Sequence, residues 1–150
     1  DASQHIPWPD STFTRVLALD VIEHVDDRQG LLREIRRVLR PGGRLFIAAP
    51  NSDTTWRRRL RLAGLPSYSD PDHRVEYTQG EFLAELRRGG FEPDGPVCPT
   101  VYDTPWAGAI DVVGGFSLRL YAGLQRWKRQ VALRCPEETT GFCVVARLRP

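Results

Sequence analysis

The sequence has no methionine and only three cysteines, and it contains no long apolar run. Cys98, Cys135 and Cys143 lack Cys-x-x-Cys spacing, which argues against a zinc centre and predicts reduced, buried residues of a cytoplasmic protein. No stretch reaches the roughly 18 apolar residues of a membrane-spanning helix, so no such helix is predicted. What is present is a chain of 150 residues, 41% of them hydrophobic, which suffices for the core of one domain.

Acidic and basic residues are unevenly distributed, although the formal net charge is only +2. Residues 1–27 contain six acidic side chains and one arginine, whereas residues 28–64 contain ten arginines and two acidic side chains. This pattern predicts an acidic surface formed by residues 1–27, beside a basic surface formed by residues 28–64.

Residues 13–51 have the pattern of a strand, a helix and a second strand. The apolar segment Val16–Leu19 runs into Asp20, and a second apolar segment, Leu45–Ala49, runs into Pro50 and Asn51. A strand, crossover helix and strand in this order form a βαβ unit with parallel strands, and ligands gather at the carboxyl ends of such strands. We therefore expect a site beside Asp20, with Asn51 more plausibly a turn or cap residue than a ligand.

The helix between these strands is predicted over residues 27–39. Asp26 or Asp27 can cap its amino terminus, where a negative charge also suits the helix dipole. Its apolar stripe recurs at spacings of three and four and comprises Leu31, Leu32, Ile35, Val38 and Leu39. The sequence Pro41-Gly42-Gly43 is expected to end it.

Further helices are predicted over residues 53–63, 79–88 and 107–133. The middle one begins at a capping box from Thr78 to Glu81. The last is amphipathic, and it is either one long helix or two helices joined near Gly114-Gly115.

Two more strands are predicted, at 91–98 and at 142–148. In the second, Phe142, Val144, Ala146 and Leu148 alternate with neighbours that are mostly apolar too. That composition predicts a strand buried on both faces.

Three motifs of this chain resemble motifs of the class I S-adenosylmethionine-dependent methyltransferases, including the ubiquinone-pathway enzymes, and they follow one another in that family's order. Asp20-Val21-Ile22-Glu23-His24-Val25 resembles the end of that family's fourth strand, and Leu39–Leu45 resembles the turn into its fifth. Asp1-Ala2, followed by Ile6-Pro7-Trp8-Pro9-Asp10, is similar to the passage after its third strand. The resemblance covers about residues 1–98 well and residues 141–147 tolerably.

The resemblance implies an α/β fold formed by the last four strands of a seven-stranded Rossmann-like sheet. These strands are expected at 14–20, 44–49, 91–98 and 142–148, the last antiparallel and inserted between the second and third. Residues 1–150 would form one truncated methyltransferase domain with a helical insertion at about 100–140.

The family's glycine-rich cofactor loop would lie before residue 1, so we expect a fragment or a gene product that has lost its front half. Strand 14–20 would then be an unpaired apolar edge, partly wet and prone to aggregation or dimerisation. The isolated chain should bind the cofactor very weakly.

The implied activity is transfer of a methyl group from S-adenosylmethionine to oxygen or nitrogen of a small or lipid-linked acceptor. Asp1 and Ala2 would contact the adenine, and Asp20 would lie near the methyl donor and the acceptor. The alternative is a non-catalytic remnant that acts as a binding or scaffolding module.

In two subgroups of the family, an acid-x-x-Glu-His pattern binds a divalent ion. Asp20, Glu23 and His24 match it in spacing, with Asp in place of the usual Glu. Magnesium would suit these oxygen ligands and would acidify a substrate hydroxyl. Alternatively, Glu23 and His24 only orient the loop, with His24 bonding to the backbone.

His73 is a second catalytic candidate, because its unperturbed pKa lies near neutrality, although a lone loop histidine is more often a surface residue. The Arg57–Arg61 run and the basic helix near Trp127 could meet phosphate, but a solvated face is the simpler interpretation. Nucleic acid is not an expected partner, since no aromatic sheet motif is present. Segment 107–133 suits contact with the inner face of a membrane, or a lid over the substrate cavity.

Overall fold

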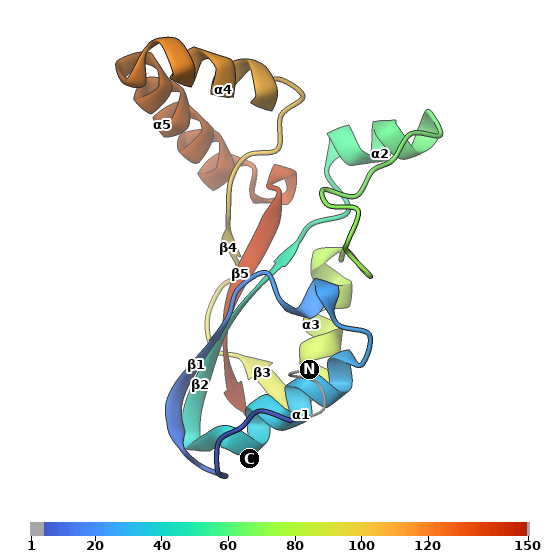
Figure 1. Cartoon of the computed structure of the whole chain (residues 1–150), viewed down its shortest axis with the longest axis vertical. Coiled ribbons are helices and arrows are strands. Elements are labelled where there is room, and N and C mark those ends of the chain that lie inside the picture. Colours follow the sequence, from blue (N-terminus) through green and yellow to red (C-terminus); the bar gives the residue numbers. More distant parts are fainter. Residues whose placement is uncertain (1–4, 150) are drawn as a thin grey trace.

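The computed structural model describes residues 5–149 as a mixed sheet with helices on one face and a helical hairpin beyond one end (Figure 1). β1 (Phe13–Ala18) is followed by the short 3-10 helix η1 (Ile22–His24), α1 (Arg28–Val38) and β2 (Leu39–Pro50). The remaining elements in chain order are α2 (Thr55–Leu62), α3 (Gln79–Arg88), β3 (Phe91–Pro93), β4 (Cys98–Pro99), α4 (Ala107–Phe116), α5 (Leu118–Arg134), η2 (Pro136–Glu138) and β5 (Gly141–Leu148).

The strand order confirms the topology predicted for this part of the chain. The sheet runs β1-β2-β5-β3, with β4 also paired to β5. β1 and β2 are parallel, whereas β5 is antiparallel to each of its neighbours. β5 therefore lies between the second and third predicted strands, as expected. Within residues 5–149 the sheet has five strands, and the seven-stranded sheet stays a prediction.

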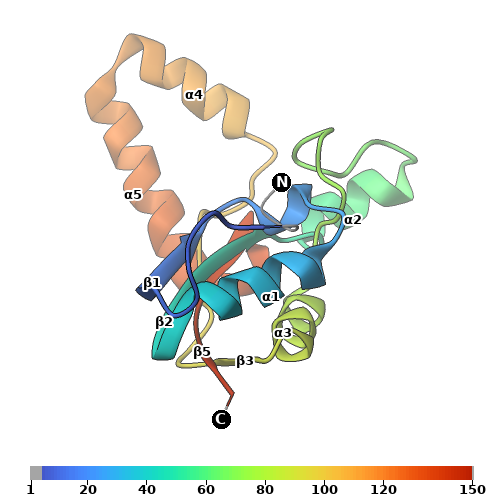
Figure 2. The same cartoon turned by 60° about the horizontal axis from the view of Figure 1, so that its bottom comes forward.

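One face of the sheet is covered by α1 and α3, which lie side by side on it (Figure 2). Leu32 and Ile35 of α1 and Phe82 and Leu86 of α3 are almost fully buried against the sheet residues Leu45, Ile47, Val144 and Ala146. Asp27 caps α1 by accepting a hydrogen bond from the Gly30 amide, and Thr78 and Glu81 form the predicted capping box of α3. The predicted apolar stripe of α1 is thus the core side of that helix.

The other face of the sheet is open. Leu17, Phe46 and Val145 are neighbours across β1, β2 and β5 and line a shallow apolar depression of about 260 Å³ there. Leu17 is 67% exposed and Leu19 is 46% exposed, and within the described residues β1 pairs with β2 alone. The expectation of a partly wet edge strand is confirmed, whereas the prediction that 142–148 is buried on both faces is wrong.

α1 ends within one residue of its predicted end, but the predicted roles of Pro41-Gly42-Gly43 and of segment 91–98 were wrong. α1 ends at Val38, and β2 begins at once, because Leu39 is already extended and buried. Gly42, with φ +74°, then lies within a bulge of β2 and does not end the helix. The predicted strand 91–98 is split into β3 and β4, since the intervening residues include Gly95 at φ +129° and a proline that cannot donate to a ladder.

The segment between β4 and β5 forms two helices, which settles the alternative that the sequence left open. α4 and α5 meet at Ser117, just after Gly114-Gly115, and make a hairpin that projects from the sheet (Figure 1). No helix among residues 5–149 is long and apolar enough to cross a membrane. Cys98 is exposed and Cys135 and Cys143 are only half-buried, so the prediction of buried cysteines was wrong.

Candidate active site

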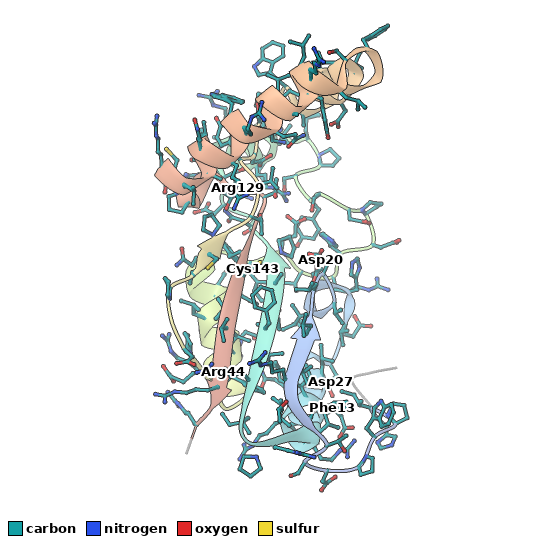
Figure 3. All side chains as sticks on the ribbon, turned by 90° about the vertical axis from the view of Figure 1, so that its left-hand side faces the viewer. Phe13, Asp20, Asp27, Arg44, Arg129 and Cys143 are labelled. Carbon is teal, nitrogen blue, oxygen red and sulfur yellow. The ribbon has the colours of Figure 1, made fainter. Side chains whose placement is uncertain are left out.

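A cavity of about 430 Å³ lies where β1 and β2 end and β5 begins. Figure 3 shows Asp20 at this end of the sheet and Phe13 at the other end of β1. Two loops and the strand ends provide its lining, which comprises Asp20, Glu23, His24, Ala48, Ala49, Pro50, Ser69, Asp70, His73, Thr100, Thr140 and Gly141. The cavity thus lies at the strand ends where the βαβ pattern predicts a site.

Asp20 follows β1 in a left-handed conformation, with φ +51°. Such a backbone is uncommon for a residue other than glycine, though aspartate tolerates it better than most. The turn ends the strand and leaves the Asp20 side chain exposed at the cavity. The Asp20 carboxylate thus lies where it can meet a ligand.

Glu23 in η1 is the buried acid of the site, at 1% exposure. Burial raises the pKa of its carboxyl group, and the nearby Asp20 charge adds to that rise. Its Oε2 atom is buried without a hydrogen-bond partner among the described residues. Its backbone carbonyl accepts hydrogen bonds from the amides of Arg74 and Val75, at 2.7 and 3.3 Å. Glu23 thereby fixes the loop that carries His73.

His24 and His73 come from segments far apart in the sequence, yet their rings meet edge to face with centroids 4.8 Å apart. His24 Nδ1 lies 3.4 Å from the backbone oxygen of Asp72. This contact matches the alternative in which His24 orients the loop. His24 is exposed, whereas the His73 side chain is 8% exposed.

His73 is held by a carboxylate. Its Nδ1 atom is 2.8 Å from Oε1 of Glu76, whose side chain is fully buried. Burial alone would raise the pKa of Glu76, but hydrogen bonds from the Ser69 amide and hydroxyl and from His73, together with the charge of Arg57, hold it below its usual value. His73 is therefore an oriented imidazole and not the surface residue that the sequence left as an alternative.

Arg57 is buried, so the prediction that it lies on a solvated face was wrong. It is 5% exposed, and it forms an ion pair with Glu76 and lies 3.5 Å from Asp103. The run of four arginines suggested a solvated face, but the first of them turns inward toward two carboxylates. Glu76 was also missed as a partner of His73, although its position three residues after the histidine was a usable signal.

The predicted metal ligands are not the set that the structure brings together. Among residues 5–149, the side chains with donor atoms within 4.8 Å of one another are Glu23, His24 and His73, and Asp20 is outside this group. Two imidazoles and one carboxylate are not the all-oxygen set that magnesium prefers. The residues thus do not fit magnesium, and we derive no step through it.

The other predicted residues have mixed outcomes. Asp1 and Ala2 lie outside the described residues, so their contact with adenine stays a prediction. Asn51 is structural, as expected: its amide donates to the backbone oxygens of Glu137 and Thr139, at 2.9 Å each, and its oxygen accepts from the Asp53 amide.

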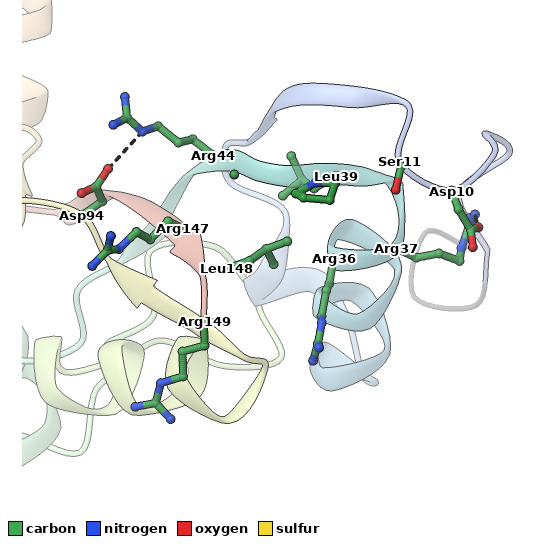
Figure 4. A pocket seen from close by; sticks show the side chains of 12 residues that line it. Asp10, Ser11, Arg36, Arg37, Leu39, Arg44, Asp94, Arg147, Leu148 and Arg149 are labelled. Atoms are coloured by element: carbon green, nitrogen blue, oxygen red, sulfur yellow. Dashed lines mark hydrogen bonds and ion pairs between the residues drawn. The ribbon is translucent and has the colours of Figure 1, made fainter.

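A larger cavity of about 640 Å³ lies at the opposite end of the sheet (Figure 4). Its charged lining is mostly basic, and one of its arginines, Arg44, is paired with Asp94 at 3.0 Å. The other charged residues in the lining are Asp10, Arg36, Arg37, Arg147 and Arg149. It lies away from the carboxyl ends of β1 and β2 and its lining contains no histidine, so the catalytic candidate is the smaller cavity.

Residues 1–47 match the family model described as a methyltransferase domain. The chain is 32% identical over 166 residues to 27-O-demethylrifamycin SV methyltransferase of Amycolatopsis mediterranei, which covers 99% of this chain and 57% of that protein. A methyltransferase structure from Thermotoga maritima superimposes with a TM-score of 0.61 at 16% identity, over 96% of this chain and 60% of the other. For 1,6-didemethyltoxoflavin-N1-methyltransferase of Burkholderia thailandensis the TM-score is 0.53 at 17% identity, over 99% and 48%.

The chain thus spans about half the length of these proteins, between 48% and 60%. The two structural matches show a shared α/β fold, and the sequence matches name the family. The family model and the sequence relatives support membership of the class I S-adenosylmethionine-dependent methyltransferases.

Proposed function

We propose that the protein containing this chain transfers a methyl group from S-adenosylmethionine to an oxygen or nitrogen atom of a small or lipid-linked acceptor. The observation that carries this proposal is the oriented His73 beside an acidic cavity at the carboxyl ends of β1 and β2. Family membership supports the donor, and the Burkholderia neighbour was crystallised with S-adenosylhomocysteine.

The acidic residues of the cavity fit a positively charged donor. S-adenosylmethionine, when bound, supplies an electrophilic methyl group on a sulfonium ion. Asp20 offers an exposed carboxylate, and the buried Oε2 of Glu23 lacks a partner among residues 5–149. Negative charge near a sulfonium favours binding of the cation.

His73 would accept the proton of the acceptor. Because Glu76 occupies Nδ1, the other ring nitrogen, Nε2, is the one available to take a proton. As the acceptor's oxygen or nitrogen forms its bond to the methyl carbon, the bond from that carbon to sulfur would break, and its electron pair would stay on sulfur to leave S-adenosylhomocysteine. The acceptor's proton would move to Nε2 of His73, and Glu76 would stabilise the resulting imidazolium. Asp20 positions the reactants, and His24 holds the loop of His73.

The test is calorimetry with S-adenosylmethionine on the full-length protein, followed by turnover of His73→Gln. We expect binding of the donor to survive and turnover to fall by about 10²-fold or more. His24→Gln is the matched control, with a loss below about tenfold expected from its positioning role. An equal loss of turnover in the two variants would mean that His73 is not the proton acceptor.

The alternative from another class is the non-catalytic binding module. Reading the residues encoded before Asp1 discriminates the two at little cost. A strand followed by a glycine-rich turn supports the enzyme, whereas its absence supports the module. A full-length protein that fails to bind S-adenosylmethionine would also favour the module.

A lipid-linked acceptor is supported by the tip of the α4–α5 hairpin. Phe116, Leu118 and Leu120 are 89%, 78% and 64% exposed there. Among residues 5–149, no ion pair involves the basic residues of α5, which are Arg119, Arg126, Lys128, Arg129 and Arg134. Exposed apolar side chains beside unpaired basic ones suit an anionic lipid surface.

Vesicle sedimentation tests this contact. The full-length protein should sediment with phosphatidylglycerol vesicles and not with phosphatidylcholine vesicles, and Phe116→Ser should weaken the association. Leu62→Ser, which changes an 88% exposed leucine on α2, is the control and should have no effect. Equal loss in both variants would contradict a contact specific to the hairpin tip.

A further inference from the structure

An aromatic cavity of about 380 Å³ lies between α2, the segment after β4 and α5. Its walls include Trp56, Tyr102, Trp106 and Trp127. The chain has four tryptophans, so three of them line this one cavity. A volume of this size is sufficient for a bicyclic or slightly larger ring system.

The aromatic side chains are arranged to receive a ring and not to fill a core. Tyr102 and Trp127 meet nearly at right angles, with planes 87° apart and centroids 5.8 Å apart. Trp106 is 71% exposed and Trp127 is 46% exposed, so much aromatic surface remains uncovered. A planar ring can stack on one of two perpendicular rings and present its edge to the other, the two favourable aromatic geometries.

The two carboxylates that line this cavity already contact other groups of the protein. Glu138 already accepts hydrogen bonds from the amide and hydroxyl of Thr55, at 2.9 and 2.6 Å. Asp103 accepts a hydrogen bond of 2.6 Å from Thr54 and lies 3.5 Å from Arg57. Arg59, in contrast, has no ion-pair partner among residues 5–149. An uncompensated guanidinium favours an electron-rich ring with oxygen substituents, because it can stack on the ring or donate to the oxygens.

A chain of polar contacts joins this cavity to the proposed catalytic base. Asp103 lies beside Arg57, Arg57 is paired with Glu76, and Glu76 holds His73. Arg57 therefore contacts one residue that lines the aromatic cavity, Asp103, and one residue that holds the proposed base, Glu76. A ligand in the aromatic cavity would lie near the catalytic cavity.

We infer that the aromatic cavity binds a planar, oxygen-bearing aromatic ring of the methyl acceptor and holds it away from the reacting atom. That the ring belongs to a methyl acceptor rests on the proposed function, whereas the binding of such a ring does not depend on it. The substrate class is then an acceptor with a fused or substituted aromatic ring.

The test uses calorimetry of the full-length protein with 2,7-dihydroxynaphthalene, without S-adenosylmethionine. Trp106→Leu and Trp127→Leu should each weaken binding by about tenfold, since each removes a stacking surface. Trp8→Leu is the matched control: Trp8 is the fourth tryptophan, it is also exposed, and it contacts Phe13 far from this cavity. The control should bind like the unmodified protein.

Two further ligands sharpen the result. The saturated analogue, decahydronaphthalene-2,7-diol, has the same hydroxyl groups without the flat ring and should bind at least about tenfold more weakly. Phenyltrimethylammonium should not bind more tightly than dihydroxynaphthalene, and if it does, the cavity is a cation site and the inference is wrong. Equal affinity of all three tryptophan variants for dihydroxynaphthalene would also overturn it.

Failure of this inference is distinguishable from failure of the proposed function. Trp106→Leu and Trp127→Leu should retain affinity for S-adenosylmethionine, because neither residue lines the catalytic cavity. If the unmodified protein did not bind S-adenosylmethionine, methyl transfer would be refuted, but the measured binding of dihydroxynaphthalene would still support the inference.

Discussion

Two parts of the molecule are stabilised by different kinds of contact. The sheet layer, which consists of the sheet with α1 and α3, has a continuous apolar core to which α2, α4 and α5 contribute nothing. The upper lobe consists of α2, residues 65–76, residues 100–106, the α4–α5 hairpin and residues 135–140. Only Val75 of this lobe packs against that core, and the lobe contains several buried polar side chains. Of the eight polar residues that are buried among residues 5–149, six lie in this lobe or where it joins the sheet: Asn51, Thr54, Arg57, Glu76, Thr104 and Thr139.

The two proposed sites lie where the buried polar contacts are. Apolar packing does not require one exact partner for each side chain, so the sheet layer can be built from many similar apolar residues. Buried charges need specific partners, and in the upper lobe the same partners orient His73 and border the aromatic cavity. The upper lobe also leaves large apolar side chains exposed, as expected of surfaces that bind something.

The largest expected effect tests the buried ion pair of the upper lobe. Arg57→Met should lower the free energy of unfolding by about 3–5 kcal/mol, because Glu76 would remain buried without its partner. Arg58→Met is the control, since Arg58 is 53% exposed and its carboxylate contacts are 3.6 and 4.0 Å long. It should change stability by less than about 0.5 kcal/mol. Urea denaturation of the full-length protein measures both, and similar losses would remove the distinction between the two arginines.

The second effect tests the core of the sheet layer. Leu45→Ala should lower the free energy of unfolding by about 2–5 kcal/mol, because Leu45 is fully buried and the change leaves a cavity. Leu118→Ala in the hairpin makes the same chemical change at a residue that is 78% exposed, and should cost less than about 0.5 kcal/mol. A large loss for Leu118→Ala in urea denaturation would mean that the hairpin tip is packed in solution.

The sheet layer could be predicted from the sequence much better than the upper lobe, for a physical reason. Apolar periodicity reports burial directly, so β1, α1, β2 and the stripe of α1 were recognised. A buried charge has no such signature, because Arg57 looks like its neighbours Arg58 and Arg59 until its carboxylate partners are known. Asp20 and His73 were named from strand ends and residue chemistry, but the Glu76 contact depends on how a loop folds.

A smaller effect compares the two helix caps. Thr54→Ala should cost about 2 kcal/mol, because Thr54 both caps α2 and donates to Asp103 at 2.6 Å. Thr78→Ala removes only the cap of α3, part of a more exposed capping box, and should cost about 1 kcal/mol. Thermal denaturation of the two variants provides the comparison. A reversed order would show that the Thr54–Asp103 contact adds nothing to the upper lobe.

The next effect depends on pH and concerns Glu23 at the boundary of the two parts. Burial raises its pKa above the ordinary value of 4.5, so ionisation on going from acid to neutral pH destabilises the folded protein. Glu23→Gln should therefore be more stable than the unmodified protein at neutral pH, and the gain should disappear below about pH 4. Melting temperatures measured across this range test it. A gain that persists at low pH would point to packing and not to charge.

The smallest effect concerns Glu34, a carboxylate of the sheet layer whose pKa is shifted in the opposite direction from that of Glu23. Hydrogen bonds from Arg37 and from the Ile6 amide lower the pKa of Glu34 from 4.5 to about 2. A lowered pKa stabilises the folded state above the unfolded value, and that contribution is lost as the pH falls from about 4.5 to about 2. Glu34→Gln should thus be less stable than the unmodified protein at neutral pH, and the two should converge near pH 2. Because this pair lies near the surface and salt screens it, the difference should also shrink in high salt, whereas that of Glu23→Gln should not. If the two variants responded alike to salt, the buried and near-surface carboxylates would share one environment, and the contrast between them would fail.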